Sequence, residues 1–152
     1  MRHKRLFPFC LCITLLAMGA CGSKTSTLDA DEALDYCAHQ VERALEALQP
    51  CDYTMMPRNI LAGDMQEGWN CREAIPQEWC SGFWSGVLWM AYDHTGDEAL
   101  RTEAERYTAS LEYMASRPAY DHDLGFIIIN SFLKGYELTG DAHYREVALR
   151  AA

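Results

Sequence analysis

Two side chains that can do chemistry stand 44 residues apart, at equivalent places in the chain. Trp79 and Asp123 each come directly before a run of apolar residues. If both runs form neighbouring helices that point the same way, the indole and the carboxyl group emerge at the same end of the fold. An indole stacks on the face of a pyranose ring, and a carboxyl group moves protons or holds hydroxyls. The pair therefore indicates a sugar site on one rim of the molecule.

Each residue also has an ordinary structural explanation. An Asp at the start of a helix is most often an N-cap, and a Trp before a buried helix often only closes the edge of a core. The triplet Asp121-His122-Asp123 carries metal-ligand side chains, but adjacent ligands rarely converge on one ion. We therefore expect neither a metal nor another cofactor.

Composition and missing motifs exclude several other functions. The chain has 13 Lys and Arg against 22 Asp and Glu, a formal charge of −9. Such an acidic surface repels phosphate, so we expect no nucleic-acid partner. The sequence contains no Gly-rich phosphate loop and no G-x-S-x-G motif, and its Cys and His residues show no catalytic arrangement. With 152 residues, 49% of them hydrophobic, it fits one compact domain.

An internal repeat predicts the elements that position these side chains. Six residues recur at a shift of 44: Tyr92, Thr95, Gly96, Asp97, Arg101 and Ala104 match Tyr136, Thr139, Gly140, Asp141, Arg145 and Ala148. In both copies a helix that is apolar nearly all round precedes one with a single apolar stripe. This order predicts an all-α fold of helical hairpins in two concentric layers, as in an α/α toroid or an α-solenoid, with fully buried inner helices.

Apolar spacing and helix stop signals place the individual elements. We expect helices over 30–49, from Ser81 as N-cap to His94, from Asp97 to Pro118, over 124–139, and from Asp141 onward. The segment 51–78 has no sustained period and is predicted to be a long loop, of the kind that is often functional.

The N-terminus has the features of an export signal. A basic start is followed by an apolar stretch from Leu6 to Ala20 that is too short for a comfortable transmembrane span. Residues 1–20 are thus predicted to be a signal peptide. Small residues before Cys21 resemble a lipobox, so we expect a lipidated Cys21, a linker over 21–29, and an exported protein of the periplasm or cell envelope that meets the membrane only through its lipid. Ordinary secretory cleavage near Ala20 is the alternative.

Four cysteines remain in the predicted mature chain, in a compartment that permits disulfides. They are Cys37, Cys51, Cys71 and Cys80. One or two disulfides are possible, and the pairing stays open.

Motifs around Trp79 and Asp123 carry a family resemblance. The first is Trp79-x-Ser81-Gly82-Phe83-Trp84-Ser85-Gly86, followed by Tyr92 and Thr95-Gly96-Asp97. The second is His122-Asp123-Leu124-Gly125-Phe126, followed by Ser131-Phe132, Gly135-Tyr136 and Thr139-Gly140-Asp141. Together they resemble glycoside hydrolase family 88, the unsaturated glucuronyl hydrolases. Met56-Pro57-Arg58-Asn59-Ile60 is similar to a Pro-Arg segment upstream in many members, so the match covers roughly residues 55–152.

The resemblance implies a fold, a substrate and a reaction. Residues 30–152 would form the N-terminal portion of an (α/α)6 barrel. The substrate would be an oligosaccharide with a 4,5-unsaturated uronic acid at its non-reducing end, as polysaccharide lyases leave it. A carboxylic acid protonates C4 of the vinyl ether, water adds at C5, and the hemiketal collapses to release the sugar.

The resemblance also implies roles for three residues. Asp123 matches one of two essential aspartates; it would hydrogen-bond the substrate and keep its partner protonated, because two close carboxyl groups cannot both ionise cheaply. Trp79 would line the subsite for the unsaturated sugar. His122 is assigned to the same substrate-binding set, where it would orient Asp123 or cap its helix.

One departure from the family pattern bears on activity. The second aspartate of the family, its principal acid, lies further along than residue 152, and no acid here matches it. We therefore expect an N-terminal fragment of the barrel that is inactive and poorly stable by itself. A helical-repeat lipoprotein that binds glycans or proteins without chemistry is the alternative. The unsaturated rhamnogalacturonyl hydrolases share barrel and chemistry but match the segment 122–126 less well.

Overall fold

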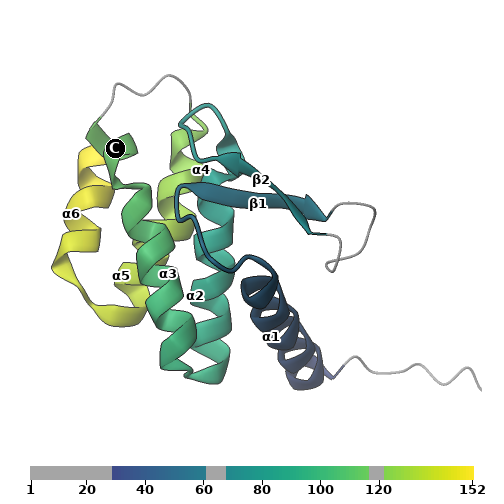
Figure 1. The fold of residues 1–152 in the computed structure, drawn as a ribbon. Coiled ribbons are helices and arrows are strands. Elements are labelled where there is room, and N and C mark those ends of the chain that lie inside the picture. The colour runs from purple at the N-terminus through teal and green to yellow at the C-terminus, as the bar shows by residue number, and fades with distance from the viewer. Residues whose placement is uncertain (1–28, 61–67, 117–121) are drawn as a thin grey trace, which may run out of the picture.

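A computed structural model describes residues 29–60, 68–116 and 122–152 of the chain (Figure 1). The elements are α1 (Ala30–Ala47), β1 (Met55–Ile60), β2 (Trp69–Glu73), η3 (Trp79–Gly82), α2 (Phe83–Thr95), α3 (Glu98–Ser110), η4 (Glu112–Ser116), α4 (Leu124–Ile128), η5 (Ile129–Leu133), α5 (Lys134–Thr139) and α6 (Ala142–Ala151). Here η3 and η4 are 3-10 turns, and η5 is a π-helical stretch that joins α4 to α5 in one continuous helix. The predicted signal peptide and Cys21, with Gly63, Pro118 and Asp121, lie outside the described residues.

The helices form the two layers that the repeat predicts. The inner helices are α2 and the continuous α4–η5–α5, with α1, α3 and α6 packed around them (Figure 1). The two copies of the repeat have matching corners: Gly96 and Gly140 adopt φ 69° and 71°, and their amides donate to the carbonyls of Tyr92 at 2.7 Å and Tyr136 at 2.8 Å. This left-handed conformation costs glycine little.

An Asp then starts each outer helix. Asp97 accepts a hydrogen bond from the Ala99 amide at 2.8 Å, and Asp141 accepts one from the His143 amide at 2.9 Å. Both predicted N-caps are thus confirmed, and four of the six positions shared by the two copies build the corner.

The inner helices approach each other through glycine. A Cβ atom on Gly82 would lie 2.3 Å from the Ile127 carbonyl oxygen, and one on Gly86 would lie 2.9 Å from that of Asn130. Neither position has room for a side chain. This contact fixes the spacing between α2 and α4–η5.

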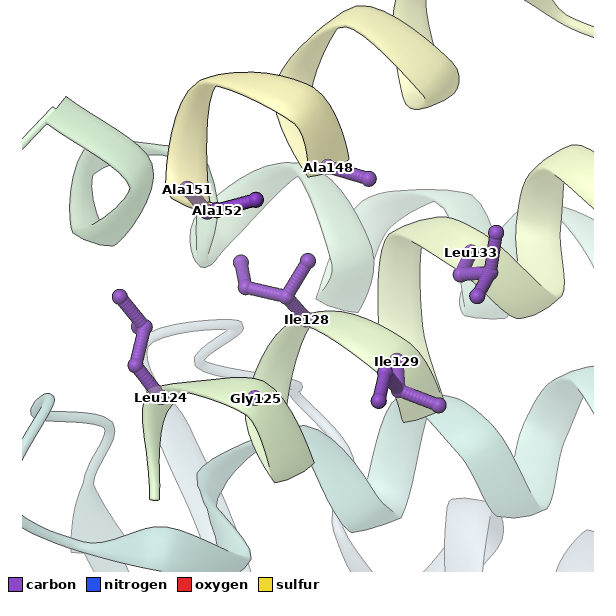
Figure 2. A pocket seen from close by; sticks show the side chains of 8 residues that line it. All are labelled: Leu124, Gly125, Ile128, Ile129, Leu133, Ala148, Ala151 and Ala152. Atoms are coloured by element: carbon purple, nitrogen blue, oxygen red, sulfur yellow. The ribbon is translucent and has the colours of Figure 1, made fainter. Parts of the chain in front are cut away.

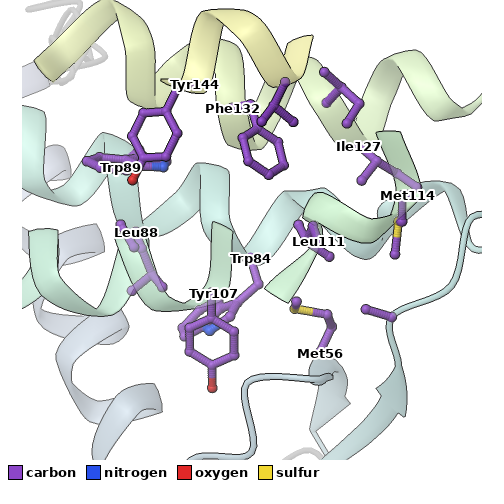
Figure 3. Packing of buried hydrophobic residues seen from close by; sticks show 14 of the residues in the cluster. Met56, Trp84, Leu88, Trp89, Tyr107, Leu111, Met114, Ile127, Phe132 and Tyr144 are labelled. Atoms are coloured by element: carbon purple, nitrogen blue, oxygen red, sulfur yellow. The ribbon is translucent and has the colours of Figure 1, made fainter. Parts of the chain in front are cut away.

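Aromatic side chains fill the space between the layers (Figure 3). The rings of Trp89 and Phe132 each meet Tyr144 edge-on, with centroids 6.0 and 5.9 Å apart. Nε1 of Trp89 donates to the Thr108 hydroxyl at 2.9 Å, in a fully buried hydrogen bond. The second hairpin is thereby packed onto the first.

The prediction that the inner helices are buried on all sides is wrong for one face. Val87, Met90, Phe126 and Ile129 are exposed, Met90 by 59%. Apolar periodicity reports which residues avoid water, but among the described elements α1 only borders this face at Val87 and Met90 and leaves it exposed.

Three further expectations are corrected. The segment 51–78 is not only loop, because β1 and β2 pair antiparallel within it. Ser81 does not cap α2, since η3 begins at Trp79 and the Ser81 hydroxyl donates to the Ile75 carbonyl at 3.2 Å. The helix from Asp97 ends at Ser110 and continues as η4.

The four cysteines of the expected mature chain are all described, and each is a free thiol. Burial raises the pKa of the Cys71 thiol, which therefore stays protonated at neutral pH. Among the described helices, none is both long and apolar enough to cross a membrane.

Candidate active site

Trp79 opens the turn that leads into α2. Its side chain is 49% exposed, so the indole is not merely the edge of a core. Its ring meets Phe83 and Phe126 edge-on, with centroids 5.2 and 6.4 Å apart. The ring is thus supported by two aromatic neighbours while about half of its surface stays open to solvent, as stacking on a sugar requires.

Asp123 stands at the N-cap position of α4 but is not used as a cap. Its backbone is already helical, with φ −66° and ψ −19°, and its side chain makes no capping hydrogen bond within the described residues. The capping residues Asp29, Asp97 and Asp141 all have extended backbones instead. The simple N-cap explanation of Asp123 is therefore not supported.

His122 lies beside Asp123. Its Nε2 lies 3.3 Å from Oδ1 of Asp123, and the imidazole is 89% exposed while the carboxylate is 28% exposed. The two side chains are therefore in contact, and the role of His122 stays a prediction.

The structure brings Trp79 and Asp123 to the same end of the inner helices. Phe126, which touches the Trp79 ring, lies one turn after Asp123 on the same helix, and its amide donates to the Asp123 carbonyl at 3.0 Å. Figure 1 shows the start of α4 at the same end as the strands that lead to Trp79. An indole and a carboxylate from neighbouring hairpins thus share one rim.

Two arginines and a glutamate beside this rim were not singled out for chemistry by the sequence. Arg58 on β1 donates through Nη2 to Oε2 of Glu78, and Nη1 of Arg72 on β2 lies 3.6 Å from Oε1 of the same carboxylate. Glu78 directly precedes Trp79. The Pro-Arg segment and the position of Glu78 were the available signals, but pairing them requires the hairpin, which was predicted as loop.

A groove elsewhere on the molecule is lined by apolar residues and carries no reactive side chain. It runs between α4–η5 and α6 and is lined by Leu124, Gly125, Ile128, Ile129, Leu133, Ala148, Ala151 and Ala152 (Figure 2). These side chains offer neither a proton donor nor a metal ligand. Over 29–60, 68–116 and 122–152, no three His, Cys, Asp or Glu side chains gather as a metal site would need.

The sequence was compared with family models and with individual curated proteins. No family model matches the chain. It is 39% identical over 77 residues to the unsaturated chondroitin disaccharide hydrolase of Streptococcus pneumoniae and 39% identical over 77 residues to the unsaturated glucuronyl hydrolase of a Bacillus species. Each alignment covers 49% of this chain, and 19% and 20% of the relatives. The matched region thus spans about a fifth of the relatives' length.

Solved structures match a larger share of the chain. An unsaturated glucuronyl hydrolase specific for heparin has a TM-score of 0.65 at 30% identity, over 80% of this chain and 31% of that one. A mutant of the Streptococcus agalactiae enzyme in complex with dGlcA-GalNAc6S also has a TM-score of 0.65, at 25% identity, over 84% of this chain and 33% of that one. The fold is accordingly confirmed as part of an α/α toroid. These matches confirm the resemblance to glycoside hydrolase family 88, the unsaturated glucuronyl hydrolases, over the part of its members that the chain spans.

Proposed function

We propose that this chain supplies Trp79 and Asp123 to an active site that hydrates 4,5-unsaturated uronic acids at the non-reducing end of oligosaccharides. The observation that carries the proposal is their common rim, with Asp123 not used as a helix cap. The relatives support the substrate class, since one is named for unsaturated chondroitin disaccharide and one solved neighbour holds dGlcA-GalNAc6S.

Each residue has a defined part in this reaction. The exposed face of Trp79 stacks on the unsaturated ring. Asp123 accepts hydrogen bonds from the sugar and, as a nearby negative charge, raises the pKa of the carboxyl group that protonates C4. His122 holds Asp123 in place through its 3.3 Å contact. Water then adds at C5, and the hemiketal collapses.

The protonating acid is a second carboxyl group. Glu78 is the other described carboxylate next to Trp79, but two arginines hold it, so it does not fit this part. We propose that the acid comes from the remainder of the barrel. The match of this chain to the heparin-specific hydrolase covers 31% of that protein. By itself the 152-residue chain is then expected to be inactive. Turnover comparable to that of intact enzymes would refute this.

The decisive experiment replaces Asp123 by Asn in the full-length gene product. Loss of the ultraviolet absorbance of the unsaturated uronate reports hydration. Asp123→Asn is expected to abolish it and to retain substrate binding, while Asp97→Asn, which changes a capping Asp at the other end of α2, retains both. Activity unchanged by Asp123→Asn would instead favour the helical-repeat binding protein without chemistry.

We also propose that Cys21 carries a lipid anchor that holds the protein at the cell envelope. This rests on the small residues before Cys21 and the polar stretch that follows it. Cys21→Ser is expected to move the protein from the membrane fraction to the soluble fraction; an unchanged distribution would favour ordinary cleavage near Ala20.

A further inference from the structure

A β-bulge in the hairpin redirects Arg58. Pro57 pairs with Cys71, but the next pair along the hairpin is Asn59 with Asn70, so Arg58 is an extra residue with no partner in the register. Bulges re-aim a side chain and are often found beside active sites. Here the guanidinium of Arg58 reaches Oε2 of Glu78, 20 residues further along the chain.

Glu78 belongs to the turn that carries Trp79. Its amide donates to the Ile75 carbonyl at 3.0 Å, and its carbonyl accepts from the Ser81 amide at 2.8 Å. The Arg58 and Glu78 side chains are only 22% and 27% exposed. A charge-assisted bond shielded in this way is stronger than an ion pair on an open surface. It therefore fastens this turn to the bulge.

We propose that the Arg58–Glu78 ion pair is a positioning device that fixes the Trp79 indole for stacking on the substrate. This rests on the proposed function for the identity of the ligand. The edge contacts with Phe83 and Phe126 set the tilt of the ring, but they do not fix the backbone of the turn that bears it. Arg72 provides an internal comparison: it approaches the same carboxylate at 3.6 Å but is 59% exposed. Arg72 lies in the same hairpin, but it is regularly paired with Met56 and is not part of the bulge.

The test follows the indole N–H signals in a two-dimensional ¹H–¹⁵N spectrum. The chain has four tryptophans, and Trp79→Phe identifies the signal of Trp79. Arg58→Ala and the isosteric Glu78→Gln are expected to shift and broaden this signal, while those of Trp84 and Trp89 stay in place and report an intact core. Arg58→Lys is expected to restore it in part, and Arg72→Ala to leave it unchanged.

A binding titration with an unsaturated uronyl disaccharide completes the test. Arg58→Ala and Glu78→Gln are expected to raise the dissociation constant about tenfold, and Arg72→Ala less than twofold. The proposal is overturned if Glu78→Gln leaves the Trp79 signal in place, or if Arg72→Ala moves it as far as Arg58→Ala does. If the unmodified protein binds no unsaturated disaccharide, the proposed function fails, and the indole comparison still decides whether the ion pair positions Trp79.

Discussion

Replacing Gly86 by Ala tests how closely the two inner helices must pack. The new Cβ would lie 2.9 Å from the Asn130 carbonyl oxygen and 3.2 Å from its Cβ. Ordinary contact needs about 3.5 Å, so the helices must separate by roughly half an ångström. The obstructing oxygen belongs to helix backbone and cannot rotate away.

Two opposing terms set the magnitude. Ala in place of Gly favours the helix by about 1 kcal/mol, whereas overpacking a well-filled contact costs roughly 1–3 kcal/mol. The difference between the two terms predicts that Gly86→Ala lowers the free energy of unfolding by up to about 2 kcal/mol. Gly82→Ala has its closest contact at 2.3 Å, to the backbone of Ile127, and is expected to cost more.

Gly125 supplies the matched control, because a Cβ there meets nothing within 4 Å. Gly125→Ala is expected to raise the free energy of unfolding by up to about 1 kcal/mol. Urea denaturation followed by far-ultraviolet circular dichroism gives all these values by linear extrapolation. Gly86→Ala as stable as Gly125→Ala would refute the reasoning, since the helices would then tolerate separation without cost.

Four further substitutions test the buried hydrogen bond, an ion-pair cluster and the caps. Thr108→Val leaves the buried Trp89 N–H without its acceptor and is expected to cost about 1–3 kcal/mol in urea denaturation; unchanged stability would contradict this. Hydrogen bonds from Arg150 and His143 lower the pKa of Glu112 below its usual 4.5. The carboxylate therefore stabilises the fold above that value, and the benefit is lost as the pH falls through the lowered pKa. The wild type should thus melt above Glu112→Gln near about pH 6, and the difference should shrink towards about pH 3; a constant difference would refute the pKa shift. Asp141→Ala should cost about 0.5–2 kcal/mol as a lost cap, and Asp123→Ala less, whereas equal losses would make Asp123 a cap after all.

The corner motif could be predicted because its determinants are local. Gly96 and Gly140 provide the left-handed residue, and the Asp after each provides the cap, within a few positions of each other. The period of 44 then gave the order of inner and outer helices. The common rim of Trp79 and Asp123 followed from that order, without knowledge of any contact between them.

The hairpin and its ion pair could not be predicted, because their determinants are distant in sequence. Pro57 interrupts the strand signal in β1, and Met56 is the one fully buried residue of that strand. The pairing of Arg58 with Glu78 depends on a register shift that no local pattern encodes. The exposure of Met90 on α2 was not predicted for a different reason: an apolar pattern shows that a residue avoids water in the folded protein but not which element covers it.

The two ends of each inner helix hold different kinds of residue. The Thr-Gly-Asp corners close the ends of α2 and α5, whereas Trp79 and Asp123 stand where α2 and α4 begin. Sequence changes in the corners can therefore alter thermal stability without touching Trp79 or Asp123, at the opposite ends of these helices. Substitutions at the two corners therefore test stability at a distance from Trp79 and Asp123, whereas Gly82 beside Trp79 bears on both.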